Sequence, residues 1–429
     1  MRTCLQLLVF GLGMLVSDAT LQADQPWAAD AALVAKLSAS KPEFIYDESR
    51  VPEFTLPDPL LSVNGTNVSD AAGWLGRRNE TLELFRSHVY GRRPKLNYDV
   101  MFEVTEENQG LFDGNATGRA VTVTIASGAE KYSFPLLVFI PTKNKSTGSS
   151  PTGSCPAVIH INNREFPTLA TAITDQDGFW PVENLIKRGY VACAVSTSAI
   201  DPDRADGFNQ GVRGFFAMAA GDASAVAGDD AWKALSAWGW GASRALDYLL
   251  TLDQVDKSKI ALIGHSRGGK SALWAAAEDT RFAIVCSNNS GCGGAALSRR
   301  AYGETVARIT NSFPHWFCDR FATYSGIESK LPIDQHQLIA LIAPRPVYVT
   351  SASEDLWADP RGEYLSLVEA ASVYKLLGQD AIGTHEMATL EEPRIVGKTG
   401  YHIRSGQHGL NAYDWEKYLD FCDKQWAND

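Results

Sequence analysis

The feature that most constrains this chain is the segment at residues 260–270, which reads Ile-Ala-Leu-Ile-Gly-His-Ser-Arg-Gly-Gly-Lys. A short apolar run typical of a buried strand enters a Gly-x-Ser-x-Gly pentapeptide, and a helix-forming run at 271–277 follows it. This order predicts a strand, a sharp turn that exposes Ser266, and a helix whose positive end faces the serine oxygen. The turn needs small flanking residues, which Gly264 and Gly268 supply. The pattern therefore predicts Ser266 as a nucleophile, and its alternative is a glycine-rich turn that only permits close packing.

The apolar runs around this turn predict the fold class. From residue 156 onward, predicted strands at 157–161, 190–195, 260–263, 282–286 and 347–351 alternate with predicted helices at 182–188, 239–250 and 365–377. This alternation indicates a mostly parallel central sheet with helices on both faces. Together with the serine turn it predicts a three-layer α/β-hydrolase fold. Period-two patterns within 98–140 predict antiparallel strands before the parallel part, and 412–426 is predicted to be a C-terminal helix.

The first 23 residues have the pattern of a secretory signal peptide, because Arg2 precedes an apolar run at 5–16 and small residues follow. No other apolar run approaches the length of a membrane span, so we expect a soluble monomer, secreted or periplasmic, that does not engage a membrane. Residues 24–429 are predicted to form a single domain. Its first part, about 24–95, is an N-terminal extension with predicted helices at 28–37 and 78–89.

Charge and cysteine content exclude other classes of function. The formal net charge is −11, and an acidic chain gains nothing from neutralising phosphates, so we expect no nucleic-acid partner. Of the seven cysteines, six lie beyond the predicted signal peptide, and six allow fifteen disulfide connectivities. Cys193 and Cys286 lie in predicted buried strands, and we expect both to be free. No Cys/His cluster has zinc-site spacing, and we expect neither a metal nor a cofactor.

A serine hydroxyl becomes a nucleophile only when a base accepts its proton, and an acid orients that base. In α/β-hydrolases the chain order is serine, acid, histidine. His408 is the candidate base, because it lies in a glycine-flanked loop just before the C-terminal helix. Two alternatives remain: His402 is the base, or His408 is an ordinary surface histidine. His336 precedes an apolar helix and is expected to cap it or to be structural.

The acid is expected at the end of a later strand. The strand predicted at 347–351 leads into a loop that carries Glu354, Asp355 and Asp359. Asp355 is the candidate acid, Glu354 is the alternative, and Asp359 is placed to cap the helix after Pro360. The loop could also be only an acidic, solvated segment.

Two cations follow the serine and bear on the charge that develops during acyl transfer. The backbone N–H of Arg267 is the expected donor to a substrate oxyanion, and its guanidinium adds a permanent positive charge. Lys270 lies one helical turn beyond Ser266, on the same face of the predicted helix. The two cations favour a polar or uronic-acid substrate over a lipid, although Lys270 could simply be solvated.

The segment Gly264–Lys270 resembles the Gly-x-Ser-Arg-x-Gly-Lys signature of the glucuronoyl esterases, carbohydrate esterase family 15. The resemblance covers roughly residues 155–425 and continues through matching segments at 290–295, 314–317, 334–336, 343–345, 355–357 and 406–408. It implies cleavage of esters between 4-O-methyl-glucuronic acid on xylan and lignin alcohols, with no metal. It also implies that Ser266 is the nucleophile, His408 the base and Arg267 an oxyanion-stabilising residue, and that Lys270, Glu304 and Trp357 contact the glucuronoyl sugar.

Two positions depart from that family's pattern. Many members place the triad glutamate where this chain has Asn289, which leaves the role to Asp355, as in bacterial members with an acid after the later strand. Fungal members place cysteines where this chain has His265 and Gln407, so that disulfide is absent here. Both departures indicate a bacterial-type enzyme. The alternatives are another carbohydrate esterase on the same fold, such as an acetyl xylan esterase, and a non-catalytic carbohydrate-binding protein.

Overall fold

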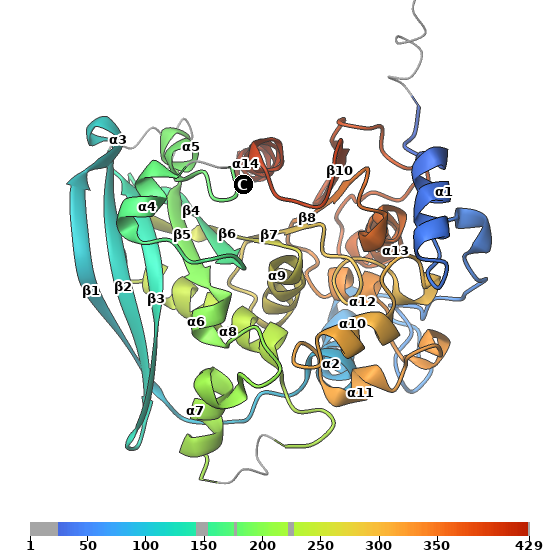
Figure 1. Ribbon diagram of the computed structural model, residues 1–429, viewed down its shortest axis with the longest axis horizontal. Helices are drawn as coiled ribbons and strands as arrows, with labels where there is room; N and C mark the ends of the chain where they lie inside the picture. Colours follow the sequence, from blue (N-terminus) through green and yellow to red (C-terminus); the bar gives the residue numbers. More distant parts are fainter. Residues whose placement is uncertain (1–24, 143–152, 176–177, 222–226, 428–429) are drawn as a thin grey trace, which may run out of the picture.

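A ten-stranded sheet forms the centre of the molecule in the computed structural model, which describes residues 25–142, 153–175, 178–221 and 227–427 (Figure 1). The strands are β1 (Asp99–Gly110), β2 (Ala116–Ser127), β3 (Glu130–Pro141), β4 (Cys155–Asn162), β5 (Val191–Ser196), β6 (Val255–His265), β7 (Ile284–Asn288), β8 (Val347–Ala352), β9 (Arg394–Val396) and β10 (Thr399–Arg404). Their spatial order is β1-β2-β3-β5-β4-β6-β7-β8-β10-β9. The block from β5 to β10 is parallel, and β1, β2, β3 and β9 pair antiparallel at the two edges.

Helices cover both faces of the sheet, which confirms the predicted three-layer α/β fold. The longer helices are α1 (Ala31–Ser40), α2 (Ala71–Phe85), α7 (Val212–Ala219), α8 (Ala234–Leu249), α9 (Arg267–Glu278), α10 (Val306–Ser312), α13 (Pro360–Leu376) and α14 (Ala412–Trp426). The shorter ones are α3 (Leu111–Gly114), α4 (Leu169–Thr174), α5 (Val182–Lys187), α6 (Thr197–Ile200), α11 (Asp319–Ala322) and α12 (Gln335–Ala340). Helices α4, α5 and α14 pack on one face, and α8, α9, α12 and α13 pack on the other (Figure 1).

Alternating side chains of the central strands supply the two cores. On β6, Ile260 and Leu262 face the core under α8 and α9, whereas Ala261 and Ile263 face the core under α14. Because successive side chains of a strand point to opposite faces, a continuous apolar run is what a strand buried on both faces requires. This is why the run before the serine could be assigned to a central strand from sequence.

Several predicted boundaries were wrong, for local reasons. The helix expected at 78–89 begins earlier, at Ala71, because the Asp70 side chain accepts a hydrogen bond from the Gly73 N–H at 2.8 Å, and after Phe85 it widens into a π-helical turn, Arg86–Tyr90. Helices α8 and α13 also begin about five residues before their predicted starts. Helix α8 is buried around nearly its whole circumference, so the start of the helix has no periodic apolar pattern to mark it. Strand β7 lies two residues further toward the C-terminus than predicted. The predicted C-terminal helix matches α14.

The cap of α13 and the state of two cysteines agree with the predictions from sequence. Asp359 caps α13 as proposed, since its side chain accepts from the Gly362 N–H at 3.0 Å. All six cysteines of the described residues are buried, and Cys193 and Cys286 are unpaired as expected. The predicted signal peptide lies outside the described residues. Within the described ranges, no helix is long and apolar enough to cross a membrane.

Candidate active site

The serine turn joins β6 to α9 and is strained as its sequence requires. Ser266 has φ +55° and ψ −123°, outside the helical and extended regions that ordinary residues occupy. The turn can be this tight because Gly264 has no side chain: a Cβ there would lie 2.1 Å from the carbonyl oxygen of Gly268. The N-terminal end of α9 begins at the next residue, Arg267, so the positive end of the helix faces the serine.

His408 and Asp355 lie beside this turn as a hydrogen-bonded pair. The loop after β10 carries His408 and the loop after β8 carries Asp355, and His408 Nδ1 lies 2.6 Å from Asp355 Oδ2. The His408 ring is 44% exposed, whereas the Asp355 side chain is only 5% exposed. The His408 ring also packs 4.5 Å, between centroids, from the ring of His265, the residue before Ser266. The structure thus brings a buried carboxyl group and a half-exposed imidazole beside the turn that carries Ser266.

Asn289 provides a second hydrogen bond to the same acid. Its side-chain amide donates to Asp355 Oδ2 at 3.1 Å, so this oxygen accepts from both Asn289 and His408. The residue has φ +45°, a left-handed conformation that aims its side chain from the end of β7 toward the loop after β8. An amide side chain excludes Asn289 as the acid, and no motif in the sequence indicates its contact with Asp355.

The other histidines that follow the serine have other partners. His402 is fully buried and its Nε2 lies 2.9 Å from Asp414, while His336 is buried against the carbonyl of Pro57, 2.9 Å from its Nε2. His336 lies within α12, and Asp334 is the residue that caps this helix. His385 pairs with Glu369 on the surface, and His315 is described below. Among the described residues, His408 alone of this set hydrogen-bonds the candidate acid.

Glu354 lies beside the acid but faces another way. It is exposed, and its backbone N–H donates to the Gly406 carbonyl at 2.9 Å. A second backbone bond runs from the Ser353 N–H to the Arg404 carbonyl at 2.8 Å. The loop that carries Asp355 is therefore joined through its backbone to the loop that carries His408.

The guanidinium of Arg267 is held by a network that the sequence did not reveal. Arg267 Nε lies 2.6 Å from Asp203, and its Nη2 donates to the carbonyl of Asn163 at 2.7 Å. Asp203 also binds His315 Nε2 at 2.8 Å and the indole N–H of Trp316 at 2.7 Å. Burial alone would raise the pKa of Asp203, but the hydrogen bonds and the positive charge of Arg267 hold it below its ordinary value. Asp203 thus stays ionised and fixes the direction of the arginine.

Lys270, Glu304 and Trp357 interact with one another. Lys270 is buried, with its ammonium hydrogen-bonded to the carbonyl of Ser290 and 5.9 Å from the ring of Trp316. The Glu304 backbone N–H donates to the Trp357 carbonyl at 2.9 Å. Burial raises the pKa of Glu304, and the charge of Lys270 opposes this rise. The three residues predicted to bind sugar are therefore close to one another.

The N-terminal extension completes this side of the site. Phe44 packs edge-on against Trp357 with ring centroids 4.7 Å apart, and the Lys41 ammonium lies 4.7 Å from the centre of the same ring. The Gly303 N–H donates to the carbonyl of Ile45 at 2.8 Å. Lys41 and Phe44 of the N-terminal extension thus help to position Trp357, which their sequence did not indicate.

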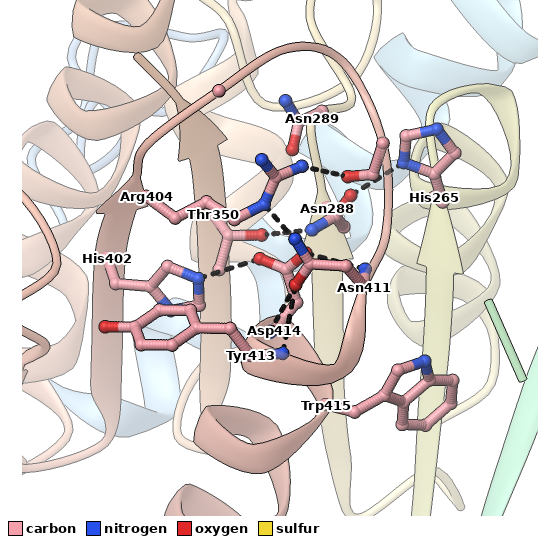
Figure 2. Close-up of polar contacts among 12 residues, drawn as sticks. His265, Asn288, Asn289, Thr350, His402, Arg404, Asn411, Tyr413, Asp414 and Trp415 are labelled. Atoms are coloured by element: carbon pink, nitrogen blue, oxygen red, sulfur yellow. Dashed lines mark hydrogen bonds and ion pairs between the residues drawn. The ribbon is translucent and has the colours of Figure 1, made fainter. Parts of the chain in front are cut away.

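A buried polar network lies beneath the histidine loop. Figure 2 shows His402, Arg404 and Asp414 joined by hydrogen bonds, and His265 joined to Asn288. Burial, and next the charge of His408, lower the pKa of His265 well below its ordinary value, so His265 remains neutral. Within the described ranges, no group of three His, Cys, Asp or Glu side chains is arranged to hold a metal ion.

Comparison with known proteins identifies the family. Residues 221–378 match the family model described as glucuronyl esterase, fungi. A carbohydrate esterase from an unknown prokaryotic organism, MZ0003, is 39% identical over 404 residues, which cover 89% of this chain and 91% of that protein. The 4-O-methyl-glucuronoyl methylesterase 1 of Wolfiporia cocos is 29% identical, over 75% of this chain and 72% of that protein.

Solved structures agree with the sequence comparisons. The glucuronoyl esterase from Solibacter usitatus superimposes with a TM-score of 0.79 at 36% identity, over 88% of this chain and all of that one. A CE15 esterase from a marine bacterial metagenome, described as promiscuous, has a TM-score of 0.76 at 38% identity, over 89% of this chain and 99% of that one. With the serine turn and the central sheet, these similarities show that the chain belongs to the glucuronoyl esterases, carbohydrate esterase family 15, and is a carboxylic ester hydrolase of the α/β-hydrolase fold.

Proposed function

We propose that this enzyme hydrolyses esters of 4-O-methyl-glucuronic or glucuronic acid, of the kind that links xylan to lignin alcohols, with Ser266, His408 and Asp355 as its catalytic triad. The observation that carries the proposal is the 2.6 Å contact between His408 and the buried Asp355 beside the strained serine. The substrate class is supported by the Wolfiporia cocos relative, a 4-O-methyl-glucuronoyl methylesterase.

The first half of the reaction forms an acyl-enzyme. His408 accepts the proton of Ser266 as the serine oxygen attacks the ester carbon, and the resulting imidazolium is stabilised by Asp355. The carbon–oxygen bond to the alcohol then breaks, and His408 gives the proton to the departing oxygen. The bond from Asn289 to Asp355 keeps the carboxylate aligned with Nδ1 of His408 during both transfers.

The second half of the reaction releases the acid. Water loses a proton to His408 and attacks the acyl carbon, and the proton returns to Ser266 as the ester bond to the serine breaks. In both halves the oxyanion lies at the start of α9, where the backbone N–H of Arg267 donates to it and the guanidinium adds positive potential. Asp203 holds that guanidinium in place before substrate arrives.

The glucuronoyl ring binds between α9 and the loop after β8. Lys270 and Glu304 offer a cation and a carboxyl to the ring hydroxyls, and Trp357 offers an aromatic face. Lys270 uses one of its three donors on the Ser290 carbonyl, which leaves donors for the sugar. A uronate ester is a polar ligand that suits this lining better than an acetyl group does.

The protein acts outside the cytoplasm. The apolar run at 5–16 and the small residues after it support export by a signal peptide over residues 1–23. We assign residues 24–429 to one catalytic domain, because the N-terminal extension contacts Trp357. The enzyme acts as a monomer on glucuronoxylan or a lignin–carbohydrate ester, and needs no metal or cofactor.

The test compares benzyl glucuronate with 4-nitrophenyl acetate as substrates. We expect turnover of benzyl glucuronate at a kcat/KM well above that of the acetate, and its loss in Ser266→Ala. Rapid acetate hydrolysis without glucuronate turnover would instead assign the enzyme to acetyl esters. Unchanged hydrolysis by Ser266→Ala would refute the catalytic role of the serine.

A further inference from the structure

We propose that Arg404 is a positioning residue for the base, and that its guanidinium holds the loop at 405–409 so that His408 stays aligned with Asp355. The inference rests on the proposed role of His408. It assigns a function to a buried arginine that neither contacts substrate nor belongs to the triad.

The contacts of Arg404 are distributed along the whole loop. Its Nη1 donates to the carbonyl of Ser405 at 2.9 Å, and its Nη2 donates to the carbonyls of Gln407 at 3.1 Å and Gly409 at 2.6 Å. The last two carbonyls belong to the residues on either side of His408. Figure 2 shows the guanidinium inside the arch of chain that runs from β10 to α14. A planar guanidinium with five N–H donors can hold several carbonyls at fixed angles, which a lysine ammonium cannot reproduce.

The fourth contact anchors the guanidinium to the fold. Arg404 Nε donates to Asp414 Oδ2 at 3.0 Å, and the Arg404 and Asp414 side chains are 6% and 0% exposed. Asp414 is the third residue of α14, and its Oδ2 also accepts from the Asn411 N–H at 3.0 Å. The arginine therefore connects the base loop to the first turn of a helix that packs on the central sheet.

His402 fixes the other oxygen of that anchor. Its Nε2 lies 2.9 Å from Asp414 Oδ1, and its Nδ1 lies 3.1 Å from the hydroxyl of Tyr348. Burial lowers the pKa of His402, so the ring is neutral; it donates through Nε2 to the carboxylate and accepts from the tyrosine through Nδ1. Asp414 thus has both oxygens bound and cannot rotate away from the arginine.

The base loop needs this support because its outer side is open. His408 is 44% exposed, and Ser405 and Gln407 are exposed as well. Backbone bonds to the acid loop hold the part near Gly406, but the carbonyls on either side of His408 are held by Arg404. A displacement of about 1 Å at a reacting group can reduce the rate roughly a hundredfold, so the arginine controls catalysis without touching substrate.

The test is steady-state kinetics of Arg404→Ala with benzyl glucuronate, with guanidinium added back. Arg299 provides the matched control, because it is a 5% exposed arginine paired with the fully buried Asp334, and it also donates to backbone carbonyls. We expect Arg404→Ala to lower kcat by roughly tenfold to a hundredfold with KM changed about twofold at most, and millimolar guanidinium to restore part of the loss. Arg299→Ala should lower the Tm comparably and keep kcat per folded molecule near that of the wild type.

Equal kcat values for the two alanine variants would overturn the proposal, and so would a loss in Arg404→Ala that appears in KM alone. If Arg404→Ala does not fold, Arg404→Lys decides in the same way, because the ammonium can pair with Asp414 but cannot hold three carbonyls. His408→Ala separates this inference from the proposed function. An active His408→Ala refutes the function itself, whereas an inactive His408→Ala with a fully active Arg404 variant refutes only the positioning role.

Discussion

A single oxygen atom, Oδ2 of Asp355, connects the parts of the catalytic group. It lies 2.6 Å from His408 Nδ1 and 3.1 Å from the Asn289 amide. A carboxylate that accepts two such bonds is fixed in direction, and this makes Asp355 better suited than the exposed Glu354 to orient the base. In the proposed triad, Asn289 is thus a donor to the acid rather than the acid itself.

Glu363 is a second buried carboxyl, behind the site, and it predicts a pH-dependent stability. The Gly291 N–H donates to it at 2.8 Å, and its other oxygen lies 2.7 Å from the Ser351 hydroxyl. Burial raises its pKa from 4.5 to about 8. Between pH 4.5 and about pH 8, Glu363 keeps its proton in the folded chain and releases it in the unfolded chain. The contribution of Glu363 to stability is therefore fully present below pH 4.5 and is lost as the pH rises toward about 8.

Glu363→Gln removes this titration and keeps both contacts, because an amide accepts from Gly291 and donates to Ser351. Chemical denaturation of both proteins from pH 5 to pH 8 measures the difference. We expect the wild type to lose stability relative to Glu363→Gln as the pH rises, with a slope of at most about 1.4 kcal/mol per pH unit. Parallel stability curves across this range would show that Glu363 is ionised in the fold.

At the residue scale, candidate site residues in loops at the ends of predicted strands could be found from the sequence. Residues that act only through tertiary side-chain contacts could not. Ser266, Asp355 and His408 each follow a predicted strand or precede a predicted helix, so topology alone placed them at one edge. Asp203 and Arg404 act through side-chain contacts to residues distant in the chain or through backbone carbonyls, and no periodicity or motif signals such contacts. The network of Asp203 therefore required the structure.

At the scale of elements, the turn between β6 and α9 is the most constrained part of the fold. A Cβ on Gly264 would lie 2.1 Å from the Gly268 oxygen, whereas a Cβ on Gly76 in α2 would meet nothing within 4 Å. The same substitution, glycine to alanine, should therefore have opposite effects at the two sites. The helix starts that the sequence misplaced, in α2, α8 and α13, are set by capping and burial rather than by the apolar pattern.

Thermal unfolding of Gly264→Ala and Gly76→Ala tests this contrast. Overpacking at Gly264 should cost about 1–3 kcal/mol or more and reduce activity by displacing Ser266. Gly76→Ala should raise stability by about 0.5–1 kcal/mol, because alanine favours a helix interior and has room there. A Gly264→Ala protein with wild-type Tm and activity would contradict the close approach that the turn requires.

At the scale of the whole molecule, two large apolar cores stabilise the described residues. The six cysteines of the described residues are all buried, and they are distributed over both cores. Free thiols are found at Cys193, Cys286, Cys292, Cys318 and Cys422. Burial raises the pKa of Cys193 and Cys286, which disfavours their thiolates and hence their oxidation. Ring packing between His265 and His408 joins the serine turn to the loop after β10.

Thiol labelling measures directly whether these cysteines are free. Alkylation of the denatured protein without reductant, followed by mass spectrometry, should modify Cys193, Cys286, Cys292, Cys318 and Cys422, and a reductant should leave the Tm unchanged. Fewer modified thiols before reduction than after it would reveal a disulfide and contradict this description of the fold.

The central claim, that Asp355 orients His408 for attack by Ser266, is tested most directly by the kcat for benzyl glucuronate of Asp355→Asn, with Glu354→Gln as the neighbouring control. Removal of the orienting carboxylate should lower kcat by roughly a hundredfold to ten-thousandfold, because the imidazole loses its correct tautomer and direction. Glu354→Gln should stay within about threefold of the wild type, since exposed substitutions away from reacting groups have small effects. Equal losses in the two variants, or a larger loss in Glu354→Gln, would contradict the account.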